Sequence, residues 1–185
     1  MASLRSDLYL LHLRAMLDAT DLRILDILQQ DARTSNAEIA RQIALAPSAV
    51  FQRIRKLEET GVISGYHARI DPAALELGLL AFVAVQTTEG ARARETAELL
   101  AAVPEVVEVH RVVGDDCFLL KVRVRDTAAL GALLDEKIQP LAPVASTRTT
   151  IVLSSSKDGR ALPLPAPDSA TTAVDSASRK ALRAL

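Results

Sequence analysis

The sequence predicts an α+β protein with a small helical unit on its N-terminal side and a larger, sheet-containing unit after it. Residues 17–61 contain three short runs with helical spacing, each bounded by capping residues or by glycine. Residues 79–153 alternate between apolar runs of strand length and amphipathic helical runs, in the order βαββαβ. With 185 residues, the chain has room for one or two domains.

The first predicted helix begins after Asp18. An aspartate at this position caps a helix because its side chain accepts a hydrogen bond from a backbone N–H of the first turn, and Asp21 follows three residues later. Apolar residues at helical spacing come next, namely Leu22, Ile24, Leu25, Ile27 and Leu28. This helix supplies the third element that a small helical unit needs to close its core.

The second predicted helix begins near Asn36. Ser35 and Glu38 have the spacing of a reciprocal capping pair, in which each side chain satisfies a free backbone N–H of the other residue. The apolar stripe of this helix consists of Ile39, Ala40 and Ile43. Residues 44–46 then have the length of a turn that leads into another helix.

The third predicted helix begins at Pro47 and stops before Gly61. Proline suits the first helical position because its missing N–H would have no partner there. At about 100° per residue, one side of the helix carries Val50, Ile54 and Leu57. The opposite side carries Ser48, Gln52, Arg55 and Lys56, with Ala49 and Arg53 on the flanks.

This layout is that of a DNA-reading helix-turn-helix, because a B-form major groove admits one α-helix that a second helix braces from behind. The predicted DNA-binding residues are Ser35, Asn36, Pro47, Ser48, Ala49, Gln52, Arg53, Arg55 and Lys56. The alternative is that these charges only solvate an exposed helix face. The preceding helix weighs against it, since three helices make a self-consistent module.

Composition favours a soluble, cytoplasmic protein. The chain has one cysteine and no apolar run of 18 residues, so we expect no disulfide framework, no membrane span and no targeting segment. The net charge is −1, and residues 18–70 carry seven basic and seven acidic side chains. The basic face is therefore local to the third helix, and we expect weak binding to non-specific DNA.

The second unit is predicted to contain a strand at 79–87, a helix at 91–102, strands at 106–113 and 117–125, a helix at 127–139 and a strand at 146–153. This order predicts a ferredoxin-like sandwich, in which both helices cover one face of a four-stranded antiparallel sheet. The other face would be free to pack on a second copy of the chain.

Motifs along most of the chain form an ordered series. They include LDATD (17–21), RIRKLE (53–58) and GVISGY (61–66) in the first unit, then PEVV (104–107), HRVVGD (110–115) and RTTIVL (148–153) in the second. This series, from Leu17 to about Ser155, resembles the Lrp/AsnC (feast/famine) transcription regulators. The resemblance implies a bacterial-type regulator with a winged helix-turn-helix that binds promoter DNA and a domain that senses a small metabolite, in particular an amino acid. It also implies homodimers, often assembled into tetramers of dimers, and a symmetric dimer suits palindromic DNA.

The resemblance further implies that a turn between the second and third strands forms part of an effector pocket at the contact between dimers. The effector-binding residues expected here are Gly114, Asp115, Asp116, Cys117, Phe118, Thr149 and Thr150. Asp116 stands where the family usually has an aromatic residue, and Cys117 stands where it has an acid. The alternative for this turn is a tight hairpin without a ligand. A third departure is Ala46, where the family has a capping serine, so we expect the third helix to lose about 1 kcal/mol and to fray until DNA orders it.

The sequence predicts neither catalysis nor a cofactor. His12, His67 and His110 lie on different elements without metal-ligand spacing to Cys117, and the chain has no glycine-rich phosphate loop. Two alternatives remain open at this stage. One is a sirohaem-decarboxylase-like enzyme subunit, which would need histidine and aromatic pocket residues; the other is a protein that organises DNA without an effector.

The expected domain boundaries follow from these patterns. Residues 1–16 form an N-terminal extension that is either helical or unstructured, and residues 17–61 form the helix-turn-helix domain. Residues 62–74 are a strand-like linker, residues 75–155 are the effector-binding and oligomerisation domain, and residues 156–185 are a flexible tail. The tail is poor in large apolar residues, so it cannot bury enough surface to order itself.

Overall fold

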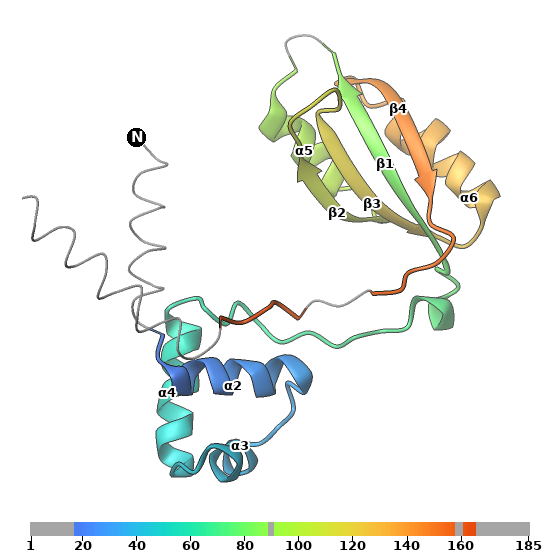
Figure 1. Cartoon of the computed structure of the whole chain (residues 1–185). Helices are drawn as coiled ribbons and strands as arrows, with labels where there is room; N and C mark the ends of the chain where they lie inside the picture. The colour runs from blue at the N-terminus through green and yellow to red at the C-terminus, as the bar shows by residue number, and fades with distance from the viewer. Residues whose placement is uncertain (1–16, 89–90, 158–160, 166–185) are drawn as a thin grey trace, which may run out of the picture. The chain divides into compact units, whose positions relative to one another are not determined.

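The computed structural model describes residues 17–88, 91–157 and 161–165. These residues form two compact units (Figure 1), one that comprises residues 17–68 with residues 161–165 and one that comprises residues 69–157. The expected extension at residues 1–16 and most of the expected tail lie outside the described residues. No helix in the described part of the chain combines the length and the apolar character that crossing a membrane requires.

The first unit contains the three predicted helices, α2 (Ala19–Gln30), α3 (Asn36–Ile43) and α4 (Pro47–Glu59). A turn through Ala44, which has the left-handed conformation at φ 55°, joins α3 to α4. The buried residues that hold the helices together are Ile24, Ile39, Ala40, Val50 and Leu57. Helix α3 thus braces α4, as the sequence predicted.

The capping interactions differ from the expectation in one respect. Ser35 accepts a hydrogen bond from the N–H of Glu38 at 3.2 Å, but the reciprocal half of this pair is missing because the Glu38 carboxylate binds Arg41 and Gln42. The reciprocal pair occurs instead at α2, where Asp18 accepts from the N–H of Asp21 at 2.8 Å and Asp21 accepts from the N–H of Asp18 at 3.2 Å. The Asp18 pair therefore fixes the start of α2 from both sides.

The linker makes no sheet ladder within the chain. Residues 62–71 contain no strand, and a 3-10 helix, η1 (Pro72–Leu75), begins after them with Asp71 as its cap. Gly61, at φ +73°, ends α4, and the N–H of Ile63 then returns to the carbonyl of Leu57 at 3.0 Å.

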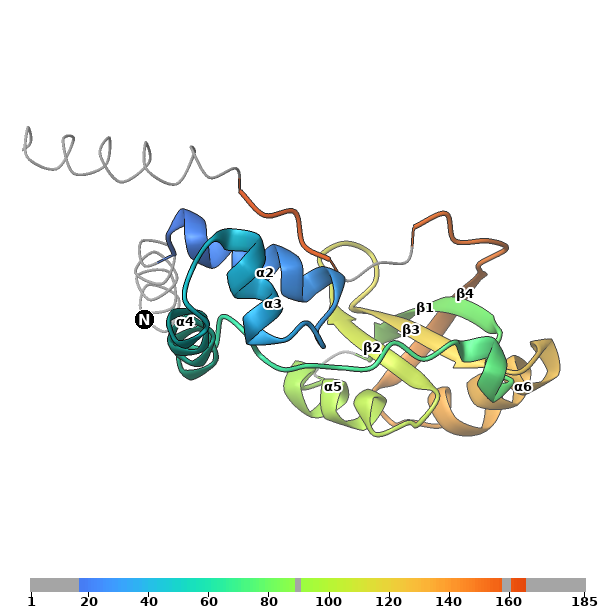
Figure 2. The ribbon, with the colours of Figure 1, turned by 90° about the horizontal axis from the view of Figure 1, so that it is seen from below.

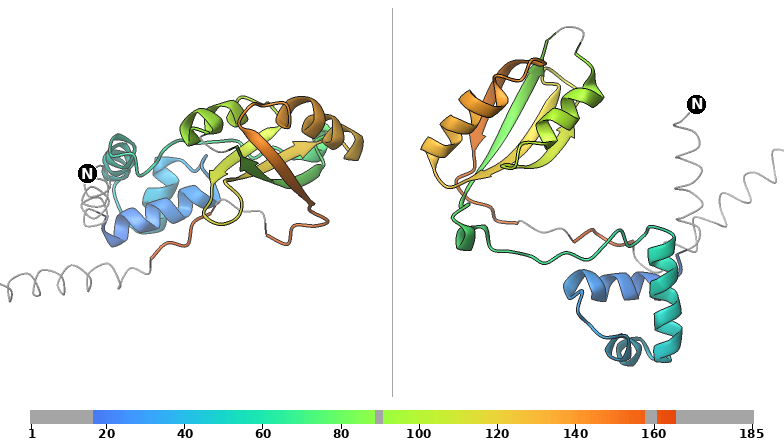
Figure 3. Two further views of the ribbon diagram at one scale, coloured as in Figure 1. Left: turned by 90° about the horizontal axis from the view of Figure 1, so that it is seen from above. Right: turned by 180° about the vertical axis from the view of Figure 1, so that it is seen from behind.

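The second unit has the predicted βαββαβ order. Its elements are β1 (Leu79–Thr87), α5 (Ala93–Ala101), β2 (Val106–Arg111), β3 (Phe118–Val124), α6 (Thr127–Ala132) and β4 (Val144–Ile151). The strands form one antiparallel sheet in the order β2-β3-β1-β4, which is the ferredoxin-like arrangement. Figures 1 and 3 show that α5 and α6 lie on the same face of this sheet.

Two elements differ from the prediction in more than the shifts of one or two residues at the ends of α5, β3 and β4. The second half of the last helix, η2 (Leu133–Ile138), is wound as a π-helix, with the N–H of Gln139 bonded to the carbonyl of Leu134 at 2.8 Å. The second strand stops at Arg111 because the chain turns there, and Val113, which the prediction included, is fully exposed.

Helices α5 and α6 cover only one of the two faces of the sheet (Figure 2). The inner face packs against the helices through a core that includes Val83, Val85, Phe118, Leu120, Val122, Leu100, Leu130 and Ile138. The register places Phe82 opposite Lys121 and Ala84 opposite Leu119, so the other face mixes apolar with charged side chains. No element of the second unit covers this outer face.

Candidate functional site

The outward face of α4 is the candidate nucleic-acid interface. Pro47, Ser48, Gln52, Arg55 and Lys56 are all exposed, whereas Val50 and Leu57 on the opposite side are buried. Ala46 makes no side-chain cap, so the N-terminal turn of α4 keeps backbone N–H groups available to an anion such as a phosphate.

Arg53 is part of the helix scaffold. Its Nη1 atom donates to Asp18 Oδ2 and to Asp21 Oδ1, each at 2.7 Å, and only 8 % of the Asp21 side chain is exposed. The hydrogen bond to Asp21, followed by that to Asp18, raises the pKa of Arg53. Burial would raise the pKa of Asp18, but its bonds to the Asp21 N–H and to Arg53 outweigh burial and lower that pKa. Arg53 therefore links α4 to the capped start of α2.

Arg55 and Lys56 remain accessible to a ligand. Arg55 Nε donates to Glu59 Oε1 at 2.8 Å, but the Arg55 side chain is 60% exposed and the Glu59 side chain is 62% exposed. An exposed pair one helical turn apart contributes only about 0.3–0.5 kcal/mol, so a phosphate can replace Glu59 at small cost. Lys56 is exposed on the same face.

The remaining predicted DNA-binding residues contribute less surface. Ser35 uses its hydroxyl to cap α3, and Ala49 is half-buried on the flank of α4. Asn36 is half-buried and lines a cavity of about 480 Å³ together with the start of the loop before α3. These three residues do not extend the exposed polar face of α4.

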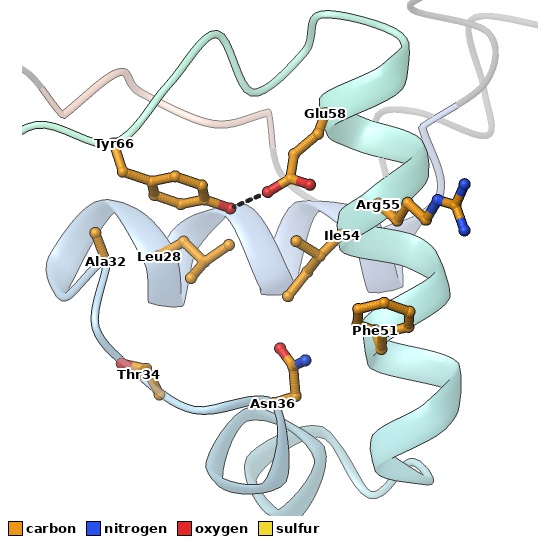
Figure 4. Close-up of a pocket in the computed structure, with 9 residues that line it drawn as sticks. All are labelled: Leu28, Ala32, Thr34, Asn36, Phe51, Ile54, Arg55, Glu58 and Tyr66. Atoms are coloured by element: carbon orange, nitrogen blue, oxygen red, sulfur yellow. Dashed lines mark hydrogen bonds between the residues drawn. The ribbon is translucent and has the colours of Figure 1, made fainter.

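Figure 4 shows this cavity between α2, α4 and the linker. Leu28 and Ile54 form its apolar floor, and the hydroxyl of Tyr66 donates to Glu58 Oε1 at 2.9 Å. Burial and the neighbouring Glu58 carboxylate raise the pKa of Tyr66 to about 12, so the phenol stays protonated at neutral pH and continues to donate. This bond attaches the start of the linker to α4.

Phe51 is a candidate site residue that the sequence pattern did not single out. Its side chain is 49 % exposed at the mouth of the cavity (Figure 4), next to the polar face of α4. The signal was its helical angle, since residues four apart differ by only about 40° and Phe51 is four residues before Arg55. An exposed phenyl ring on this face is able to contact the methyl group of thymine.

The candidate effector turn lies between β2 and β3. Gly114 has φ +140°, and a Cβ atom there would meet no atom within 4 Å. The carbonyl of Asp115 accepts from Gln86 Nε2 at 3.2 Å, and Asp115 itself is exposed. Asp116 instead binds Arg148 on β4 through its carboxylate. The turn and β4 together therefore place two acidic residues and one arginine near one another.

The structure does not bring all the predicted effector residues together. Phe118 is 1 % exposed and belongs to the core between the sheet and its helices. Thr149 pairs with Val83, while Thr150 pairs with Phe82, so the two threonines point to opposite faces of the sheet. Only Thr150 shares the outer face with Arg148.

Cys117 is held by β1. Its N–H donates to the carbonyl of Val85 at 2.9 Å, and Thr87 Oγ1 lies 3.3 Å from its sulfur. The hydrogen bond from Thr87 lowers the pKa of Cys117. In the parts of the chain that the structure describes, no three His, Cys, Asp or Glu side chains form a group able to hold a metal ion.

Comparison with known proteins agrees with both units. Residues 17–64 match the winged helix-turn-helix DNA-binding family, and residues 80–162 match the Lrp/AsnC ligand-binding domain family. The HTH-type transcriptional regulator FL11 of Pyrococcus horikoshii is 40% identical over 152 residues, which cover 82% of this chain and 99% of that protein. The chain belongs to the Lrp/AsnC family of transcriptional regulators.

Other members of the family are similarly close. The leucine-responsive regulatory protein of Escherichia coli K12 is 37% identical over 148 residues, which cover 79% of this chain and 90% of that protein. The regulator NMB0573 of Neisseria meningitidis, whose structure holds L-Met, superposes with a TM-score of 0.77 at 31% identity over 80% of this chain and 97% of that chain. AsnC of E. coli gives a TM-score of 0.71 at 29% identity over 80% and 98%. This Lrp/AsnC member is therefore a DNA-binding regulator and not an enzyme of the sirohaem-decarboxylase kind.

Proposed function

We propose that this Lrp/AsnC regulator reads promoter DNA with the outward face of α4 and adjusts that binding to a small zwitterionic metabolite, an amino acid. The observation that carries the proposal is the division of labour among the basic residues of α4. Arg53 is held by two aspartates, whereas Arg55 and Lys56 are exposed on the same side as Gln52. A helix that is fixed from behind and basic in front suits the major groove.

The exposed residues of α4 fall into two classes. Arg55 and Lys56 carry charge and bind phosphates, which supplies affinity that depends on salt. Gln52 has the amide that pairs with adenine, and Phe51 offers an apolar edge to thymine. Ser48, at the uncapped start of α4, adds a hydroxyl near the backbone N–H groups.

A homodimer would place two copies of α4 on a palindromic site. The outer face of the sheet, which includes Phe82 and Leu119, supports this arrangement because it mixes apolar side chains with paired charges such as Lys121 and Glu108, 3.1 Å apart. A second copy packed on this face would bury the apolar part. Twofold symmetry would repeat each contact across the interface, so that a residue i facing a residue j implies that j also faces i.

The effector would bind at the turn between β2 and β3. A zwitterion needs an acceptor for its ammonium group and donors for its carboxylate. Asp115 supplies the first, and Arg148, which is 75% exposed and faces Asp116, supplies the second. The L-Met found in the NMB0573 structure supports an amino acid as the ligand class.

A second candidate is DNA binding without any effector. It is favoured by the Asp116–Arg148 ion pair, because each of these groups already neutralises the other. The two candidates are separated by a titration of the twenty amino acids against binding of a duplex selected from random DNA by the full chain. We expect one amino acid to change the affinity of the wild type and to have no effect on Arg148→Met. A wild type that ignores all twenty amino acids supports the second candidate.

A further inference from the structure

The strongest feature that the proposed function does not use is the return of the chain to the first unit. The chain leaves the first unit after residue 68, and the described residues 161–165 belong to that unit again. These residues, with the sequence Ala-Leu-Pro-Leu-Pro, lie against α2.

One side chain of α2 binds both backbone groups of Leu162. The N–H of Leu162 donates to Gln29 Oε1 at 2.6 Å, and Gln29 Nε2 donates to the carbonyl of Leu162 at 3.4 Å. This pairing resembles one rung of a sheet ladder, with the amide of glutamine in place of a neighbouring strand. It recognises an extended backbone and leaves the Leu162 side chain 71% exposed.

The next leucine is less exposed. Leu164 is half-buried and forms, with Pro165, one wall of a groove of about 480 Å³. The other walls come from α2 and α3 and include the apolar side chains Leu22, Ile27 and Ile43. The prolines keep the segment extended because each disfavours helix at the residue before it.

We propose that the groove between α2 and α3 is a docking site for residues 161–165 of the chain itself, and that this docking ties the DNA-binding unit to the strand β4. The first unit then has two connections to residues 69–157, one through residues 62–71 and one through the segment that follows Ile151. No residue of α4 lines the groove, so docking leaves the exposed face of that helix free.

The position of the second connection gives it a role. The segment follows β4, the strand that carries Arg148 opposite Asp116 of the turn, with residues 152–160 between them in the chain. Both chain ends of residues 69–157 therefore lead to the first unit, one through the linker after α4 and one through the docked segment. The inference does not depend on whether an effector binds at that turn, because docking can be measured in the unliganded protein.

Limited proteolysis of the full chain tests the docking. Trypsin cleaves after Arg160, and it needs the residues on both sides of the cut to be extended in its own site, so residues 161–165 must leave the groove first. We expect Leu164→Ser and Gln29→Ala to speed cleavage at Arg160 at least threefold. Gln29→Ala does not weaken α2 as a helix, because alanine has the higher helix propensity. Rates are divided by those of synthetic peptides 155–168 with the same sequence, which removes effects on trypsin itself.

Leu162→Ala is the matched control. It removes an exposed leucine two residues from Leu164 and keeps the backbone that Gln29 binds, so its normalised rate should stay within twofold of the wild type. Equal normalised rates for Leu164→Ser and the wild type, or an equal increase for Leu162→Ala, would overturn the proposal.

A second measurement uses hydrogen exchange in two shortened chains, one ending at Pro165 and one ending at Lys157. We expect the amides of α2 to exchange at least threefold faster in the shorter chain, with β1 and β3 unchanged. Identical exchange at α2 in the two chains would contradict docking.

Discussion

Arg53 Nη1 donates to Asp21 Oδ1 at 2.7 Å, across 32 residues of sequence, and this bond joins helix α4 to the start of α2. The same nitrogen reaches Asp18, so one guanidinium binds both members of the reciprocal cap. We expect the orientation of α4, and with it the proposed DNA-reading face, to depend on this contact.

Arg53→Ala should therefore destabilise the first unit. Removing the guanidinium leaves the carboxylate of Asp21, which is 8 % exposed, without its cation, and we expect a loss of about 1–2 kcal/mol in the free energy of unfolding. Lys56→Ala, on the exposed face of the same helix, should change stability by less than about 0.5 kcal/mol. Urea unfolding followed by circular dichroism measures both. Equal stabilities of the two variants would show that Arg53 does not hold the helices together.

The same contact makes the unit sensitive to acid. Because the pKa of Asp18 is lowered in the folded state, its contribution is present above the ordinary aspartate value of 3.8 and is lost as the pH falls through the lower folded value. We expect the urea concentration at the midpoint of unfolding of the wild type to decrease once the pH drops below about 4. The decrease should be smaller in Arg53→Ala, where Asp18 has lost its cation. The contribution is small because 53 % of the Asp18 side chain is exposed. Parallel pH profiles of the two proteins would argue against the link.

The sequence predicted the elements better than the partners of their side chains. Helix starts at Asn36 and Pro47 depend on local capping and on the missing N–H of proline, and both were predicted correctly. The alternation along β3 indicates the core as well, and extending it by one step to Phe118 would have assigned that residue to the core. The partners of Arg53 lie 32 and 35 residues away, and no local pattern reveals such a contact.

Phe51 gives a prediction about base preference. If the ring contacts a thymine methyl, replacing one thymine of a selected duplex by uracil should weaken wild-type binding about fivefold to tenfold, within the range of one base contact. The same replacement should have no effect on Phe51→Ala, because the group that senses the methyl is gone. Fluorescence anisotropy with a series of single thymine-to-uracil duplexes measures this. A wild type that binds every uracil duplex as tightly as the original would rule out the contact.

The outer face of the sheet gives a prediction about assembly. A fragment that starts at Asp71 should self-associate without the first unit, because the apolar side chains on the face that carries Phe82 would otherwise remain exposed to solvent. Phe82→Glu should convert this fragment to monomer at micromolar concentration. Leu99→Glu, at an exposed leucine of α5, should leave it associated. Sedimentation velocity distinguishes these states, and a monomeric unmutated fragment would exclude this face as the dimer contact.

The most direct test of the account is the salt dependence of DNA binding by the Arg55→Ala/Lys56→Ala variant. Each phosphate contact adds about one unit to the slope of log affinity against log salt, so we expect the slope to fall by about two units. Binding to all duplexes should weaken about equally, whereas Gln52→Ala should keep the slope and relax the sequence preference. An unchanged affinity and slope in the double variant, with its circular dichroism spectrum intact, would contradict the assignment of α4 as the DNA-reading helix.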